Sequence, residues 1–61
     1  MRKIDEIILD ILSDIYPLSM DVREIADLCG YDVVLVEKTM VELMKSGKVA
    51  YDERDRYKLK A

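Results

Sequence analysis

Hydrophobic residues recur along the first quarter of the chain at the spacing of an amphipathic helix. At a period of about 3.6 residues, five isoleucines fall on one side of such a helix. These are Ile4, Ile7, Ile8, Ile11 and Ile15. Asp5 and Glu6 stand in the first turn, where the helix dipole favours negative charge. Pro17 cannot continue a helix. The pattern therefore predicts a helix over about 3–15, followed by a short extended segment.

Two further amphipathic segments follow, separated by a tight turn. The first is predicted over about 22–29, with Asp21 as its N-cap and Gly30 placed for a left-handed helix end. The second is predicted over about 33–46, with Asp32 as its N-cap. At helical spacing, the inward-facing residues are Val22, Ile25, Ala26 and Cys29, and then Val33, Val36, Met40, Leu43 and Met44.

After the third helical segment, the pattern changes from helical spacing to alternation. The apolar residues that alternate with polar ones are Val49, Tyr51, Tyr57 and Leu59, on either side of a tip made by Glu53, Arg54 and Asp55. This period of two predicts a short β-hairpin over about 48–60, with both tyrosines on its core face. The expected fold is mainly α with a small β-hairpin (α+β), in one domain over residues 1–61.

The order helix, short strand, helix, turn, helix, hairpin resembles that of the winged helix-turn-helix family over essentially the whole chain. The residues that carry the resemblance are Glu24-Ile25-Ala26 with Leu28 and Gly30, then Val36, Met40, Leu43 and Gly47. Within this family, the chain resembles small prokaryotic and archaeal transcription-regulator domains. The resemblance implies that the helix over 33–46 is a recognition helix and that the hairpin over 48–60 is a wing. Winged helices also serve as protein-interaction modules, so it implies two classes of partner.

Composition indicates the class of protein and where it is expected to act. The chain has 61 residues, of which 51% are apolar and 38% carry charges of both signs, which favours a small folded domain over a disordered segment. Asn and Gln are absent while charged residues are plentiful, a bias typical of thermophilic proteins. No apolar run has the length of a membrane span, and Met1-Arg2-Lys3 leads into an acidic segment instead of a signal-peptide core. We therefore expect no membrane partner and a cytoplasmic location.

The net charge of −3 is unevenly distributed along the chain. Residues 1–33 carry three basic and eight acidic side chains, whereas residues 34–61 carry seven basic and five acidic ones. The C-terminal half is therefore positive and suited to a phosphate backbone, which the N-terminal half would repel.

The residues give little support for catalysis or for a cofactor. The chain has no histidine and one cysteine, Cys29, which is expected to be a buried thiol. Its two glycines are explained as helix ends, so there is no phosphate-binding glycine loop. Glu6, Asp10 and Asp14 are spaced to share one side of a helix, where a solvated acidic ridge is a simpler interpretation than a metal site. We expect no catalytic residue, metal or cofactor.

The outward face of the third helix is the main candidate for binding. Its outermost row is Val34, Lys38, Val41 and Lys45, with Glu37 on one flank and with Leu35 and Glu42 on the other. DNA-binding members of the family commonly have Ser, Thr, Arg, Asn or Gln at such positions. Valine can contact a thymine methyl group and lysine a phosphate, whereas the glutamates repel phosphates. An apolar row beside charges is also typical of a protein interface.

Double-stranded DNA is the first candidate partner, and the hairpin adds basic residues to this face. The hypothesis assigns apolar base contacts to Val34 and Val41 and phosphate contacts to Lys38, Lys45, Lys48, Arg54, Arg56, Lys58 and Lys60. The alternative interpretation of the hairpin residues is a solvated edge strand, because edge strands commonly carry Lys and Arg.

A protein partner within a larger complex is the second candidate, with Val34, Leu35 and Val41 as its anchors. A homodimer through the first helix is a further possibility. Leu12 is predicted at the edge of the buried stripe and Leu9 well outside it, so both are candidate interface residues. A single exposed leucine is equally common in monomers.

Overall fold

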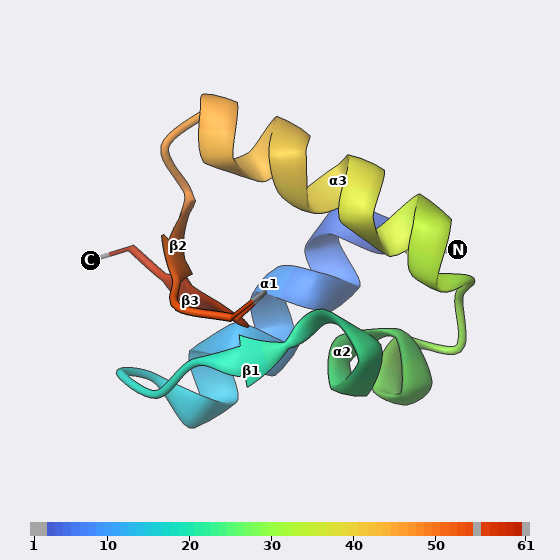
Figure 1. Cartoon of the computed structure of the whole chain (residues 1–61), viewed down its shortest axis with the longest axis horizontal. Coiled ribbons are helices and arrows are strands. Elements are labelled where there is room, and N and C mark those ends of the chain that lie inside the picture. Colours follow the sequence, from blue (N-terminus) through green and yellow to red (C-terminus); the bar gives the residue numbers. More distant parts are fainter. Residues whose placement is uncertain (1–2, 55, 61) are drawn as a thin grey trace.

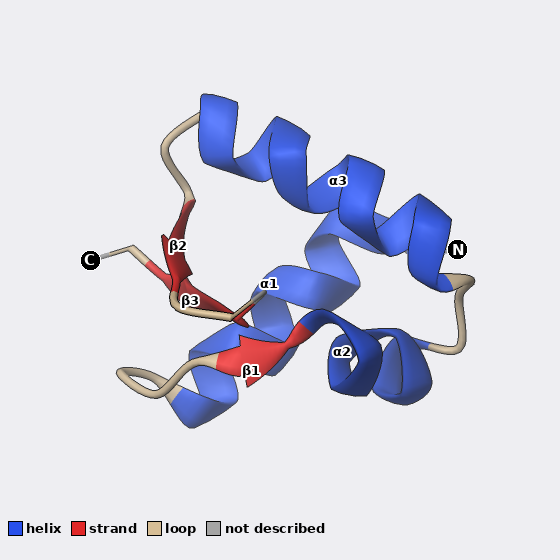
Figure 2. Cartoon of the chain, in the orientation of Figure 1, coloured by secondary structure: helices blue, strands red, loops and turns tan. Residues whose placement is uncertain are grey.

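The computed structural model describes residues 3–54 and 56–60, and it shows a mainly helical molecule with a small antiparallel sheet (α+β). The elements are α1 (Ile4–Ile15), β1 (Met20–Asp21), α2 (Val22–Cys29), α3 (Val33–Lys45), β2 (Val49–Asp52) and β3 (Arg56–Leu59). Figure 2 shows the strands gathered at one side of the molecule, with the helices making up the remainder. The predicted order of helices and hairpin is confirmed. Asp55, predicted at the hairpin tip, lies outside the described residues.

The helix boundaries follow from local chemistry. Asp21 accepts a hydrogen bond from the Arg23 backbone N–H at 2.7 Å, and Asp32 accepts one from the Val34 N–H at 3.0 Å. These carboxylates satisfy N–H groups that have no partner within the first helical turn. Gly30 ends α2 at φ 77°, a left-handed conformation that glycine adopts without steric cost. Both N-caps and the left-handed end are as the sequence predicts.

The sheet has three strands in the order β1-β3-β2, all antiparallel. The register places Met20 and Tyr51 opposite Tyr57, so these three side chains share the core-facing side of the sheet. The hairpin was predicted, but the pairing of β1 with β3 was not. A strand of two residues is too short to show an alternating pattern in the sequence.

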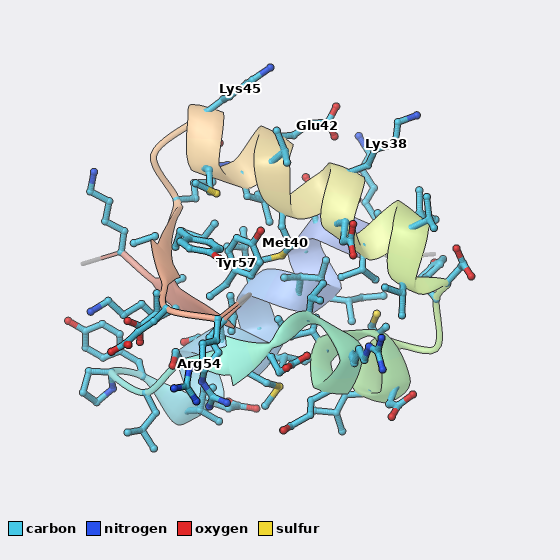
Figure 3. The ribbon with its side chains drawn as sticks, in the orientation of Figure 1. Lys38, Met40, Glu42, Lys45, Arg54 and Tyr57 are labelled. Atoms are coloured by element: carbon cyan, nitrogen blue, oxygen red, sulfur yellow. The ribbon has the colours of Figure 1, made fainter. Side chains whose placement is uncertain are left out.

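The core lies between the three helices and the inner side of the sheet. In Figure 1, α1 runs diagonally from behind α3 to the lower left of the view, passing behind β1 and α2. Figure 3 shows Met40 from α3 and Tyr57 from β3 pointing into this interior. None of the described helices is long and apolar enough to cross a membrane. The buried hydrophobic residues are Ile8, Leu12, Val22, Ile25, Ala26, Val36, Met40, Leu43, Val49 and Tyr57.

The structure corrects the predicted register of α1. Its buried line is centred on Ile8 and Leu12, both fully buried. Ile7 and Ile11 are only half-buried and are not among the residues packed against the core, although they were predicted within the buried stripe. The buried line is therefore rotated toward Leu12, because the helix carries apolar residues around more than half of its circumference.

Two further core predictions are wrong. Met44, predicted to face inward, is 39% exposed. Tyr51 is 51% exposed although it is on the same side of the sheet as buried Tyr57. Its strand forms the edge of the sheet, so the strand has a neighbouring strand on one side only. The two rings meet edge to face, with centroids 5.4 Å apart.

Candidate interaction surface

The outer face of α3 presents the predicted row of four side chains to solvent. Val34 is 68% exposed and Val41 is 47% exposed, and Lys38 and Lys45 are also exposed. Figure 3 shows Lys38, Glu42 and Lys45 extending away from the body of the molecule. The opposite side of the helix is fixed by buried core residues, which leaves this row as its outward surface. The predicted outward orientation of these four residues is confirmed.

The face combines apolar and charged groups in a small area. A shallow hollow on it is lined by Val34, Glu37, Lys38, Val41 and Glu42. Both glutamates are exposed, as is Lys38 between them. The hollow can therefore take an apolar group at its valines and a charged or polar group at its rim.

Two more of the predicted lysines lie at the base of the hairpin, where the chain leaves α3. The Lys60 backbone N–H donates to the Lys48 carbonyl oxygen at 3.1 Å, so these two residues are neighbours across the hairpin. Two residues, Ser46 and Gly47, separate Lys48 from the end of α3. Lys45, Lys48 and Lys60 are all exposed. The base of the hairpin is therefore a basic region next to the end of α3.

The tip of the hairpin is separated from this basic region. Arg54 is exposed at the tip, where its φ of 58° is left-handed. Figure 3 places Arg54 at the side of the molecule opposite Lys45. Lys58 is paired with Ala50 on the side of the sheet that faces away from the core. The predicted DNA-binding residues thus do not form one continuous surface.

Arg56 has partners within the molecule that the sequence did not predict. Its Nε donates to the Ser19 Oγ at 3.0 Å, and a terminal guanidinium nitrogen donates to the Ser19 carbonyl oxygen at 2.8 Å. Asp52 lies directly across the hairpin from Arg56. No local sequence signal connects Ser19 with Arg56, because they are 37 positions apart.

Asp52 belongs to the same group of polar side chains. The Glu53 backbone N–H donates to the Asp52 Oδ1 at 3.0 Å. This bond, a hydrogen bond from Ser19 and the charges of Lys58 and Arg56 together hold the pKa of Asp52 below its ordinary value, because each favours the carboxylate over the acid.

The surface predicted on α1 needs a correction. Leu12 is 0% exposed, and Leu9 is half-buried and packed against the core. Leu12 therefore presents no surface to a second copy, and the prediction that it is an interface residue is wrong. Leu9 does not lie well outside the buried side, because the buried line of α1 is rotated toward it.

The remaining candidates for chemistry are a thiol, a metal-ion site and a second groove. The Cys29 thiol is half-buried and donates to the Ala26 carbonyl oxygen at 3.6 Å. Within the part of the chain that the structure describes, no three His, Cys, Asp or Glu side chains are grouped to hold a metal ion. A groove between the start of α1 and the end of α3 is lined by Lys3, Ile4, Asp5, Thr39, Glu42, Leu43, Ser46 and Lys48.

Comparisons of the chain with protein-family models, with curated proteins and with solved structures gave no match.

Proposed function

We propose that the chain is a non-enzymatic winged-helix domain that binds double-stranded DNA, as a transcription regulator does, with α3 in the major groove. The order of the elements supports the fold, because α2 and α3 are joined by a tight turn and are followed by a hairpin. The observation that carries the function is the exposure of Val34, Lys38, Val41 and Lys45 along one side of α3. A helix that enters the groove must present such a row free of other elements.

The side chains divide between two kinds of DNA contact. Val34 and Val41 reach the base edges, where a thymine methyl group is the matching partner for an aliphatic side chain. Lys38 and Lys45 reach phosphates on either side of the groove, and the hairpin base adds Lys48 and Lys60. Arg54 is not included, because it lies on the other side of the molecule.

The acidic neighbours of the row limit the strength of this binding. Glu37 and Glu42 line the same hollow as Val34 and Lys38, so docking brings their charges toward phosphates. Four lysine contacts opposed by two carboxylates give weak, strongly salt-dependent binding. For four contacts, the logarithm of the affinity should fall with the logarithm of salt concentration with a slope of about −3.6.

A fluorescence titration of labelled duplex DNA at several salt concentrations tests the proposal with two charge-neutralising variants. Lys45→Gln should weaken binding and reduce the slope by about 0.9, because one phosphate contact is lost. Glu42→Gln should tighten binding at low salt, because it removes a repulsion. Both side chains are exposed, so neither change disturbs the core. If Glu42→Gln weakens binding as much as Lys45→Gln does, α3 does not face the phosphates.

A protein partner is the second candidate, and it is favoured by the apolar character of the same face. Val34, Leu35 and Val41 are exposed on α3, at 68%, 42% and 47%, between charged residues. Burial of aliphatic side chains within a polar rim is typical of a protein contact, and the two glutamates are then not penalised.

Affinity capture with wild type and Val41→Asp separates this candidate from the first. Leu18→Asp is the matched control, since Leu18 is 67% exposed but lies in the loop between α1 and β1, away from α3. Under the protein hypothesis, Val41→Asp abolishes capture, Leu18→Asp does not, and salt has little effect. Equal capture by all three proteins would exclude α3 as the interface.

A further inference from the structure

The loop before β1 is joined to β3 by one side chain. Arg56 makes two hydrogen bonds to Ser19, from Nε to the hydroxyl oxygen at 3.0 Å and from a terminal nitrogen to the carbonyl oxygen at 2.8 Å. Both residues are half-buried, so water competes less with these bonds than it does at a fully exposed site. The guanidinium is suited to this contact because its donors have a fixed planar arrangement.

This contact reinforces a strand pairing that is otherwise very short. β1 contributes only Met20 and Asp21, which pair with Tyr57 and Arg56. The bonds from Arg56 to Ser19 extend the attachment of the loop to the hairpin by one residue. Without these bonds, only two residue pairs would hold β1 to β3. A strand pairing this short separates readily by local unfolding.

The same short segment also begins α2. Asp21 is paired with Arg56 in the sheet and caps α2 through its bond to the Arg23 N–H. The position of the hairpin is therefore connected to the first residue of α2 through consecutive residues of the chain. Since α2 packs against α3, the hairpin and the outer face of α3 are held in one orientation.

A third side chain completes the group. The Ser19 hydroxyl accepts from Arg56, and it also lowers the pKa of Asp52, which is the cross-strand neighbour of Arg56. A hydroxyl oxygen that accepts from one partner keeps its hydrogen for another, so Ser19 suits a place beside both groups. With both groups engaged, the guanidinium of Arg56 is directed at the protein itself, unlike the exposed lysine side chains nearby.

We propose that Arg56 is a positioning residue, which holds the hairpin against the start of α2 through Ser19, and that it does not contact the bound nucleic acid. The consequence for binding rests on the proposed function, whereas the holding role does not. The proposal also predicts that a lysine at this position is a poor substitute, because it keeps the charge but cannot make both bonds in the same geometry.

Amide hydrogen exchange tests the holding role without any ligand. In Arg56→Lys and Ser19→Ala, exchange at the amides that join β1 to β3 should rise about five- to tenfold relative to the amides of α3. Lys58→Gln is the matched control, because Lys58 lies on the same strand and the same side of the sheet. It should leave the exchange rates unchanged. Unchanged rates in both Arg56→Lys and Ser19→Ala overturn the proposal.

The salt-dependent DNA titration then tests the second half of the proposal. Arg56→Gln should lower the affinity but leave the salt slope as in wild type, whereas Lys45→Gln reduces the slope by about 0.9. An equal reduction by Arg56→Gln would show that Arg56 contacts a phosphate, and the proposal would be wrong. If the exchange results appear as expected but wild type binds no DNA, the holding role stands and the proposed function fails.

Discussion

At the residue scale, Arg54 at the tip of the hairpin has a strained backbone conformation. Its φ of 58° is left-handed, which costs a residue with a Cβ about 1 kcal/mol or more. Arg54→Gly should therefore stabilise the fold by about 0.5 kcal/mol after the greater freedom of glycine in the unfolded chain is counted. The free energy of unfolding in urea measures this. Arg54→Ala is the control, because it removes the same charge but keeps the strain, and an equal gain from both would contradict the explanation.

Asp52 gives the fold a defined dependence on acid. Its pKa is lower in the folded state than in the unfolded chain, so between these two values the unfolded state binds more protons. The stabilising contribution of the carboxylate is present above the unfolded value of about 4 and is lost as the pH falls through the folded one.

Unfolding measured against pH for wild type and Asp52→Asn should show this contribution. Wild type should be the more stable protein at neutral pH, and the difference should shrink as the pH falls below about 4. A difference that does not change with pH would mean that the charge of Asp52 has no role.

At the scale of elements, the helix ends were predictable and the buried side of α1 was not. The caps at Asp21 and Asp32 and the left-handed Gly30 each depend on chemistry within a few neighbouring residues. The first helix instead has apolar residues over most of its surface, so periodicity alone does not decide which line is buried. Packing against α2 and α3 decides this, and it selects Ile8 and Leu12.

A pair of substitutions tests this register of α1. Leu12→Ala should destabilise the fold by about 3 kcal/mol, because it leaves a cavity among fully buried residues. Ile11→Ala, one position earlier, should cost about 1 kcal/mol, since Ile11 is half-buried and does not pack against the core. Melting temperatures measure both. A larger effect at Ile11 would restore the register that the sequence pattern favours.

At the scale of the whole molecule, only part of the candidate surface could be predicted from the sequence. The outward row of α3 follows from helical spacing, and the structure exposes all four of its residues. The hairpin is different, because alternation shows which residues point outward but not where its tip lies relative to α3. Arg54 and Lys45 consequently fall on different sides of the molecule. The partners of Arg56 depend on a contact across 37 positions of sequence, which no local pattern encodes.

The structure shows where part of the basic charge of the C-terminal half lies. The exposed basic residues Lys45, Lys48 and Lys60 are grouped where α3 meets the hairpin, whereas the acidic excess belongs to the first 33 residues. DNA docking through α3 therefore requires that the acidic α1 face away from the duplex. Under the proposed function, a protein with a net charge of −3 would then bind a polyanion through one face only.

The salt-dependent titration of duplex DNA tests the central claim most directly. Binding at low salt with a slope near −3.6, reduced by about 0.9 in Lys45→Gln and accompanied by tighter binding of Glu42→Gln, is the result that we predict. Undetectable binding to mixed-sequence duplexes at low salt, or an affinity that does not depend on salt, would contradict the claim and leave α3 as a surface for protein partners.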